Sequence, residues 1–359
     1  MSEKPNTDQH VYVQVANILR NQILFRELSG QIPSIRTLSQ LYSINFKTAN
    51  RAVTLLVEEG LCYRIIGKGT FVVDTDSGIK EFSLIGLILS DIINPNFARL
   101  AQAIQEQAHH KNMAILVNTS SRKIKRLREI LAMYKQRNVN AMIVQGGTVR
   151  DKESLKLVMN AGIPVIGDHT HLDEIDDVWL DVRAGAQMAV NHLIEQFGGP
   201  VAFVSGSDEA LTETGRFKGY RDALFSKSMK LDFRYIKSTT PNYRGGFQAV
   251  YQLLQEEKSV PRSIFLYNLV MAMGANSALT THGCRIPHDV AVAGCDDSID
   301  VEDMIVPTTT VAFSYDEEAS QILMLVEKKL KNIKSKPISI RISPKLIIRS
   351  SSQKMKRTK

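Results

Sequence analysis

The feature that most constrains the fold is a series of short apolar runs that begins near residue 82 and extends over roughly 270 residues. Stretches with the apolar spacing of amphipathic helices separate these runs. Continuous apolar strands that alternate with helices are typical of parallel sheets covered on both faces. The length predicts an α/β body with two doubly wound lobes rather than one. The expected strands are 83–90, 114–120, 141–146, 164–168, 200–206, 233–237, 263–268 and 290–297.

The first 75 residues follow a different pattern. Apolar residues at helical spacing predict helices over 10–26, 35–42 and 46–59. Ser34 and Asn45 are expected to cap the second and third helices, and Gly60 to end the third. Two strand-like runs follow, joined by Gly67-Lys68-Gly69, which predicts a hairpin over 61–74. Three helices followed by a hairpin is the order of a winged helix-turn-helix domain.

The third predicted helix has two faces of different chemistry. We expect the apolar face to be buried; it consists of Ala49, Ala52, Val53 and Leu56. We expect the polar face to be exposed; it consists of Lys47, Asn50, Arg51 and Thr54, with Thr48 on the flank. The polar residue types suit the DNA major groove, since Arg and Lys bind guanine and Asn binds adenine. For an isolated helix, a solvated polar face is the simpler interpretation. The helix before it and the hairpin after it favour DNA binding.

The segment Gly67-Lys68-Gly69-Thr70 has residue types that also bind nucleotide phosphates. A phosphate-binding loop requires GxxxxGK[ST] between a strand and a helix, whereas this segment lies between two strands and lacks that spacing. We therefore expect a tight hairpin tip. Its glycines allow close approach to a backbone, and Lys68 places a charge for a phosphate or the minor groove.

The stretch "IPSIRTLSQLYSINFKTANRAVTLLVEEGLCYRIIGKGTFV" resembles the winged-helix DNA-binding domain of the GntR family of bacterial transcription regulators, over residues 10–74. The resemblance implies that Arg36, the start of the third helix and the hairpin tip contact DNA. Many members read Ser-Arg-Thr-Thr where this chain reads Asn45-Phe46-Lys47-Thr48. The Arg contact expected at position 46 is therefore absent, and an operator sequence cannot be transferred.

Residues 83–350 resemble the effector domain of LacI-type regulators, which has the two-lobed fold of periplasmic sugar-binding proteins. The resemblance rests on stretches such as "IGLILSDIINPNFARLAQAIQEQAHHKNMAILV", "GRFKGYRDAL", "IPHDVAVAGCDDS" and "PTTTVAF". GntR-type heads on LacI-type bodies form a known group, the arabinose-repressor group. The resemblance implies an effector site between the lobes, at Asn94, Phe97, Asp168, Arg216, Asn268 and Asp296.

These candidates lie where predicted strands give way to loops, which is where ligands of doubly wound folds bind. Carboxylate, amide and guanidinium groups offer the directional hydrogen bonds that a polyol needs, and Phe97 offers a face for a sugar ring. His169 is a further candidate because it follows Asp168. Purely structural roles are the alternatives: Asp296 and Asp297 would cap a turn, and Arg216 would pair with an acid.

One departure from the LacI pattern concerns the candidate effector site. The family usually reads Asn-Asp after the strand at 263–268, but here Leu269 follows Asn268. The site has lost a carboxylate that commonly binds sugar hydroxyls. Tyr267 is also bulkier than the usual small residue, and Val182 departs from the usual Asp-Asn. A regulator whose pocket has degenerated and senses nothing is therefore the alternative interpretation.

Catalytic and metal sites are not expected. No Ser/His/Asp or Cys/His arrangement stands out, which disfavours an enzyme with an accessory head. The segment Asp168-His169-Thr170-His171 places two histidines at i, i+2 beside a carboxylate, but no third ligand follows at a recognised spacing. We predict no metal site and no cofactor.

Charge and composition refine the expected setting of the chain. No acidic residue follows Glu327, whereas twelve Lys and Arg residues do. Since the formal net charge of the whole chain is +8, the first 327 residues carry a net charge of 8 − 12 = −4. Residues 351–359 read as a basic, solvated tail. Three cysteines at unrelated spacings indicate a reducing compartment. The N-terminus lacks a secretory signal and no apolar run spans a bilayer, which disfavours a secreted binding protein and predicts a cytoplasmic one.

Together these patterns predict a ligand-responsive transcription regulator, with repression as the expected sign. The expected partners are a double-stranded DNA operator, a small polar effector of carbohydrate type, and a second copy of the chain. A pseudo-palindromic operator requires two DNA-binding heads, hence a homodimer. The predicted domains are 1–75 for the head, 76–82 for the linker, 83–350 for the body and 351–359 for the tail.

Overall fold

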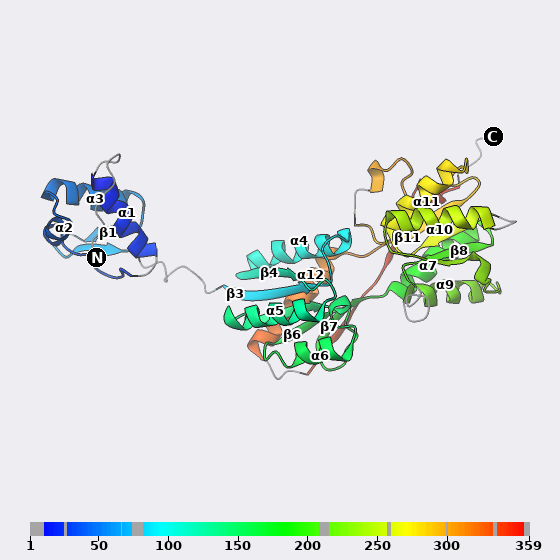
Figure 1. Cartoon of the computed structure of the whole chain (residues 1–359), viewed down its shortest axis with the longest axis horizontal. Helices are drawn as coiled ribbons and strands as arrows, with labels where there is room; N and C mark the ends of the chain where they lie inside the picture. Colours follow the sequence, from blue (N-terminus) through cyan, green and yellow to red (C-terminus); the bar gives the residue numbers. More distant parts are fainter. Residues whose placement is uncertain are drawn as a thin grey trace. The chain divides into compact units, whose positions relative to one another are not determined.

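The computed structural model describes residues 11–24, 27–65, 67–73, 82–207, 215–256, 260–298, 301–332 and 336–354. The chain divides into two compact units, Met1–Phe82 and Ser83–Lys359, called the head and the body below. The predicted linker, except Phe82, and residues 355–359 of the predicted tail lie outside the described residues. Figure 1 shows the elements of each unit along the chain.

The head consists of three helices followed by a two-stranded antiparallel sheet. The helices are α1 (Val11–Leu24), α2 (Ile35–Leu41) and α3 (Phe46–Glu58), and the strands are β1 (Cys62–Ile65) and β2 (Gly69–Val72). The strands pair from Cys62 opposite Val72 to Ile65 opposite Gly69. The predicted helices and the predicted hairpin are therefore confirmed, with ends that differ by a few residues.

Local sequence signals explain where the head helices begin and end. Ser34 accepts a hydrogen bond from the Thr37 amide, and Asn45 accepts one from the Thr48 amide, as N-caps do. Gly60 follows α3 with φ +73°, a conformation that glycine adopts without a steric penalty. The predicted apolar face of α3 is fully buried in the core of the head.

The body contains two six-stranded sheets. The first is wholly parallel, in the order β13-β7-β6-β5-β3-β4. Its strands are β3 (Ser83–Leu89), β4 (Met113–Thr119), β5 (Ala141–Gln145), β6 (Val165–Asp168), β7 (Asp176–Leu180) and β13 (Ser339–Ile342). The helices of this lobe are α4 (Pro95–His110), α5 (Ile124–Gln136), α6 (Lys152–Met159) and α12 (Tyr315–Lys331).

The second sheet has the order β14-β12-β11-β10-β8-β9, and only β14 runs antiparallel to its neighbour. Its strands are β8 (Val201–Ser205), β9 (Ile236–Ser238), β10 (Ser263–Leu266), β11 (Ala291–Cys295), β12 (Thr309–Ala312) and β14 (Lys345–Ile347). The helices of this lobe are α7 (Val182–Phe197), α9 (Gly215–Ser226), α10 (Tyr243–Glu256) and α11 (Leu269–Thr281).

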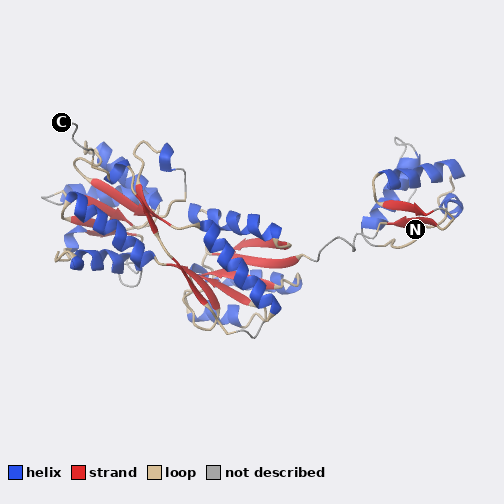
Figure 2. Cartoon of the chain, turned by 180° about the vertical axis from the view of Figure 1, so that it is seen from behind, coloured by secondary structure: helices blue, strands red, loops and turns tan. Residues whose placement is uncertain are grey.

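The chain passes between the two lobes at three places, between β7 and α7, between β12 and α12, and between β13 and β14. Figure 2 shows these passages as extended segments that run from one lobe to the other. The prediction of two doubly wound lobes is confirmed. Each lobe is therefore built from segments that are separated along the chain, which explains how α12 reaches the strands β5, β6 and β7 of the first lobe.

Two parts of the prediction are wrong in detail. The segment 233–237 begins as a 3₁₀ turn over Phe233–Tyr235, because Asp232 accepts a hydrogen bond from the Arg234 amide, and its strand β9 starts at Ile236. The predicted tail starts too early, since Ser351 and Ser352 are fully buried. The Ser351 hydroxyl donates to the Val292 carbonyl at 2.6 Å, so the body extends to Ser352.

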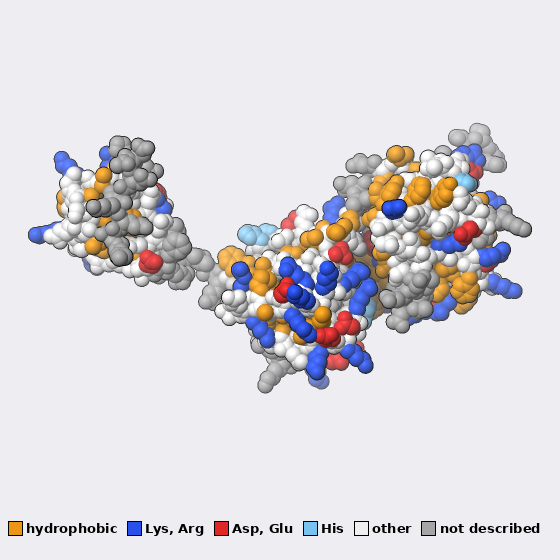
Figure 3. Space-filling model, viewed as in Figure 1, with side chains coloured by type: hydrophobic (Ala, Val, Ile, Leu, Met, Phe, Trp, Pro, Cys, Tyr) orange, Lys and Arg blue, Asp and Glu red, His pale blue; other side chains and the backbone are white. Residues whose placement is uncertain are grey.

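Each sheet of the body is covered by apolar clusters on both faces, as continuous apolar strands require. On the surface, Lys and Arg side chains gather over α5, as Figure 3 shows. The described helices include none that is both long and apolar enough to cross a membrane.

Candidate functional site

The head presents a polar face of α3 that the sequence predicted. Lys47 and Arg51 are exposed, while Thr48, Asn50 and Thr54 are half-buried. Arg36 is exposed on α2. Two of these cations therefore lie on the helix whose other face fills the core of the head, so the polar face is held in one orientation.

A residue that the sequence analysis missed organises this face. Arg64 of β1 donates to Asn50 Oδ1 at 3.1 Å and to Thr54 Oγ1 at 2.8 Å. The hairpin and α3 thus share a hydrogen-bonded side-chain group. The signal in the sequence is the strand alternation, which places Arg64 on the side of β1 opposite to that of its two neighbours.

The start of α3 forms one side of a shallow hollow of about 470 Å³, lined by Tyr12, Asn45, Phe46, Lys47, Thr48 and Arg51. The Arg51 guanidinium carbon lies 4.4 Å from the centre of the Tyr12 ring, a cation–π contact between α3 and α1. Phe46 is 60% exposed. The hollow therefore offers cations and an uncovered aromatic ring to the solvent.

The hairpin tip is fixed in its turn. Gly67 has φ +76° and Gly69 has φ +120°, which residues with a side chain rarely adopt. The Gln31 side-chain amide donates to the Lys68 carbonyl at 2.7 Å and packs so closely on Gly69 that a Cβ there would lie 2.5 Å from Gln31 Nε2. Lys68 itself is exposed.

In the second lobe, Arg216 pairs with Asp296, so the ion pair with an acid that the sequence analysis gave as the alternative role of Arg216 is present. An Arg216 Nη atom donates to Asp296 Oδ1 at 3.2 Å, and both side chains are largely buried. The guanidinium carbon also lies 4.4 Å from the centre of the Tyr267 ring. Arg216 Nε has no hydrogen-bond partner among the described residues. One buried donor of this group is thus unsatisfied in the described part of the chain.

Asn268 follows β10 and caps α11. Its Oδ1 accepts from the Met271 amide at 2.9 Å, and its amide nitrogen donates to the Pro241 carbonyl at 3.3 Å. Leu269, at the first position of α11, is 1% exposed. The position that carries an acid in the LacI pattern is therefore an apolar core position here.

In the first lobe, Asn94 caps α4 and Phe97 packs on the apolar core of the sheet. The Asn94 side-chain oxygen Oδ1 accepts from the backbone amide of Asn96 at 3.1 Å, and the backbone amide of Asn94 donates to Asp91 Oδ1 at 3.1 Å. Phe97 remains half-buried. The side chains of both residues therefore take part in intramolecular contacts.

Asp168 and His169, at the end of β6, meet a third residue that the sequence analysis missed. Glu318 of α12 places Oε1 3.3 Å from His169 Nε2, and Asp168 Oδ1 lies 3.6 Å from the same nitrogen. Burial raises the pKa of Asp168 well above its usual range and raises the pKa of Glu318 to about 8. Glu318 precedes Ile322 and Leu325 at helical spacing, so an acid on the apolar stripe of α12 was the signal in the sequence.

The two lobes are in contact near these residues. Arg99 Nε of α4 donates to the carbonyl of Ser298, which follows β11, at 3.1 Å. The charge of Asp296 is among the causes that raise the pKa of Glu318. The structure therefore brings Asp168, His169 and Asp296 toward one region, together with Glu318.

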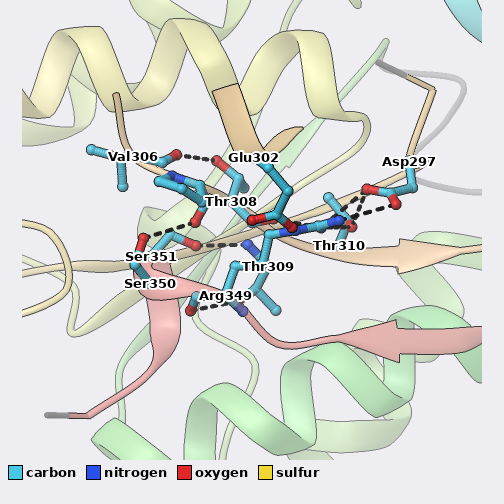
Figure 4. A network of polar contacts seen from close by, with 10 residues as sticks. Asp297, Glu302, Val306, Thr308, Thr309, Thr310, Arg349, Ser350 and Ser351 are labelled. Carbon is cyan, nitrogen blue, oxygen red and sulfur yellow. Dashed lines mark hydrogen bonds and ion pairs between the residues drawn. The ribbon is translucent and has the colours of Figure 1, made fainter. Parts of the chain in front are cut away.

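Asp297 has a different role from its neighbour Asp296. Both of its carboxylate oxygens accept from Arg349 Nη atoms at 3.1 Å, and Arg349 Nε donates to Glu302 at 2.6 Å. Figure 4 shows the Arg349 side chain between Asp297, Glu302 and the threonines of β12. Arg349 also donates to Thr310 Oγ1 at 2.8 Å. This two-pronged ion pair fixes the turn that carries Asp296.

Comparison with known proteins agrees with this architecture. Residues 190–352 match the periplasmic binding protein-like domain family. The chain is 26% identical to the transcriptional regulator DegA of Bacillus subtilis over 76% of this chain and 81% of that protein. It is 28% identical to catabolite control protein A of Priestia megaterium over 71% of this chain and 75% of that protein.

Solved structures of the same fold include regulators with bound sugars. A CelR–cellobiose complex covers 89% of this chain and all of that chain, with a TM-score of 0.67 and 18% identity. A LacI family regulator of Enterococcus faecium with bound ribose covers 76% of this chain and all of that chain, with a TM-score of 0.66 and 22% identity. The body therefore has a periplasmic-binding-protein-like fold, with LacI-type regulators among its structural neighbours.

Proposed function

We propose that the chain is a ligand-responsive DNA-binding transcription regulator that acts as a repressor. The observation that carries the proposal is the combination of two units in one chain. The head exposes Lys47 and Arg51 on a helix next to a hairpin, and the body has the periplasmic-binding-protein-like fold. The relatives with which the chain aligns are transcription regulators, which supports the same function.

For the head, we propose a winged helix of the GntR type. Support comes from the order of three helices and an antiparallel hairpin, and from the motifs that resemble that family. Helix α3 enters the major groove with Lys47, Thr48, Asn50 and Arg51, while Arg36 contacts the backbone. The hairpin tip, Gly67 to Thr70, approaches the adjacent minor groove, where Lys68 supplies a positive charge.

For the body, we propose that a small polar effector of carbohydrate type binds between the lobes. Asp168 and His169 contribute from the first lobe, together with the region around Asn94 and Phe97. Arg216, Asn268 and Asp296 contribute from the second lobe. The sugar-bound structural neighbours support this class of effector. The unpartnered donor of Arg216 and the unpartnered acceptor of Asp168 support polar recognition.

A homodimer in the bacterial cytoplasm is the state in which such a regulator works. Two heads are needed for the two half-sites of a pseudo-palindromic operator. Effector binding changes DNA affinity only through a difference in effector affinity between two arrangements of the lobes. Effector binding relieves repression when the effector prefers the arrangement that binds DNA less well.

Two substitutions test the proposal. Arg51→Ala should abolish operator binding and leave effector binding unchanged. Asp296→Asn should weaken effector binding and leave operator binding unchanged. Asn is preferable to Ala at position 296 because it keeps the shape of the side chain and a hydrogen-bond acceptor for Arg216. DNA binding that survives loss of both Arg51 and Lys47 would refute the assignment of α3.

The effector class is tested by a thermal-shift screen, since a ligand of the folded state raises the melting temperature by mass action. The panel comprises mono- and disaccharides, sugar phosphates and nucleosides. Stabilisation by a sugar that is lost in Asp296→Asn supports the proposal. The buried Leu269 gives the alternative, a regulator with a non-sensing pocket, a specific basis. That alternative predicts operator binding without stabilisation by any class.

A further inference from the structure

Three potential metal ligands converge at the end of β6. Their ligand atoms, one each from Asp168, His169 and Glu318, all lie within 4.8 Å of one another. Asp168 is 1% exposed and Glu318 is 2% exposed, while the His169 side chain is 24% exposed. The cluster is therefore a buried pair of carboxyl groups with an imidazole at its more accessible side.

The described residues provide few ion-pair and hydrogen-bond partners for the two carboxyl groups. Among the described residues, His169 is the only basic side chain in ion-pair contact with either carboxyl. Asp168 Oδ1 is buried and has no hydrogen-bond partner in the described part of the chain. A buried polar atom without a partner is costly and calls for an explanation, such as a bound ion.

Contacts within the protein hold the backbone around the cluster in one conformation without a bound ion. His169 has φ +57°, and its amide donates to the Val178 carbonyl at 2.8 Å. The His169 carbonyl packs on Gly146, where a Cβ would lie 2.0 Å from that oxygen. The Thr170 and His171 amides both donate to the Asp177 carboxylate at 3.0 Å. The turn that carries His169 is thus held by two separate elements, strand β7 and the segment that begins at Gly146.

We propose that Asp168, His169 and Glu318 bind a divalent first-row transition metal ion, with Zn²⁺ and Mn²⁺ as the best matches. One imidazole nitrogen and two carboxylate oxygens are ligands that suit these ions. Ligands about 2.1 Å from a tetrahedral ion lie about 3.4 Å from one another. The observed separations from His169 Nε2, 3.3 Å to Glu318 and 3.6 Å to Asp168, agree with that value. Water or donor atoms of an effector complete the coordination.

His171, the second histidine of the sequence motif, is not a ligand. Its ring lies 6.4 Å from the His169 ring and 5.5 Å from the Trp179 ring. The third ligand comes instead from α12, 149 residues further along the chain. The inference goes beyond the proposed function, because it holds whether or not the head binds DNA and whichever effector binds.

The test is metal binding by the full-length chain after treatment with a chelator. Zn²⁺, Mn²⁺ and Co²⁺ are each titrated and followed by calorimetry, and bound Co²⁺ is followed by its visible absorption. We expect one ion per chain and Co²⁺ bands of the intensity typical of four- or five-coordinate sites. Glu318→Gln and Asp168→Asn should each weaken binding at least 100-fold. Both variants keep the shape of the side chain, so folding is retained.

Two matched variants serve as controls. Glu317→Gln removes an exposed acid from the same turn of α12, and His171→Gln removes the neighbouring histidine; both should bind metal as the unchanged chain does. The proposal is overturned if the unchanged chain takes up no ion at millimolar concentrations, which would leave a shared proton as the only occupant. Binding that persists in both Glu318→Gln and Asp168→Asn, or that is lost in His171→Gln alone, would also overturn it.

Discussion

Arg64 of the hairpin donates to Asn50 Oδ1 of α3 at 3.1 Å, so the two elements that face DNA in the proposed function are joined through the side chain of a single residue. The same guanidinium donates to Thr54 Oγ1 at 2.8 Å. Asn50 has the residue type that reads adenine, and its orientation decides whether both of its polar atoms reach the base edge. Arg64 is therefore expected to position Asn50.

The first prediction concerns this contact. Arg64→Gln should weaken operator binding about 3- to 30-fold, because a lost hydrogen bond to a side chain contributes roughly 1 kcal/mol and a misplaced Asn loses part of its discrimination. Fluorescence anisotropy against operators with single base changes measures both effects. Arg137→Gln, an exposed arginine of the body, is the control. Equal weakening on every sequence would indicate that Arg64 binds phosphate instead of orienting Asn50.

The second prediction contrasts two ion pairs of different exposure. The Arg349 side chain is 9% exposed and pairs with Asp297 through two nitrogens, whereas the Arg285 side chain is 74% exposed in its pair with Asp289. Arg349→Ala should lower the free energy of unfolding by about 2–4 kcal/mol, since it leaves the Asp297 carboxylate without the cation that neutralises it. Arg285→Ala should cost at most about 1 kcal/mol.

Calorimetric melting of both variants and of Arg349→Lys checks this. Lys keeps the charge but not the two-pronged geometry, so it should recover only part of the loss. Because Arg349 fixes the turn next to Asp296, Arg349→Ala should also weaken effector binding. Equal melting temperatures for Arg349→Ala and Arg285→Ala would contradict the structural role of the Asp297 pair.

The third prediction concerns pH. Burial raises the pKa of Glu318 to about 8 from its ordinary value near 4.5, so the folded state holds a proton that the unfolded state releases between these pH values. The free energy of unfolding should therefore fall as pH rises from about 4.5 to about 8, by at most roughly 5 kcal/mol. Glu318→Gln should flatten this dependence.

The pH dependence of the free energy of unfolding is measured by urea unfolding in the presence of a chelator. The fluorescence of Trp179 reports the unfolding, because it is the only tryptophan of the sequence and lies in the same lobe. Metal binding has the opposite dependence: it requires ionised carboxylates, so affinity should rise over the same pH range. Identical pH profiles for the unchanged chain and Glu318→Gln would show that Glu318 has an ordinary pKa.

The fourth prediction concerns Gly146. A Cβ at this position would lie 2.0 Å from the His169 carbonyl, so Gly146→Ala must displace the turn after β6. We expect a loss of about 1–3 kcal/mol in the free energy of unfolding and weaker metal binding. Gly294→Ala is the matched control, since its Cβ would lie 3.3 Å from Ala272 and needs only a small adjustment. Unaltered metal binding by Gly146→Ala would show that the position of the turn after β6 does not affect metal binding.

The sequence by itself determined the local structure and the division into head and body. Helical spacing and the caps at Ser34 and Asn45 are properties of a few consecutive residues, so they can be read without a fold. Seven of the eight predicted apolar strands were also predicted correctly, because a strand buried on both faces is continuously apolar. The short strands β7, β12, β13 and β14 were missed, since each mixes polar and apolar residues and depends on its neighbours for pairing.

Only the tertiary structure decided which side chains meet. Glu318 joins Asp168 and His169 because the chain returns from the second lobe to the first before α12, and no local pattern records that return. Arg349 reaches Asp297 for the same reason, through an antiparallel strand added at the edge of the second sheet. Chemistry that depends on contacts between distant segments is fixed by packing, whereas caps, turns and periodicity are fixed by neighbours along the chain.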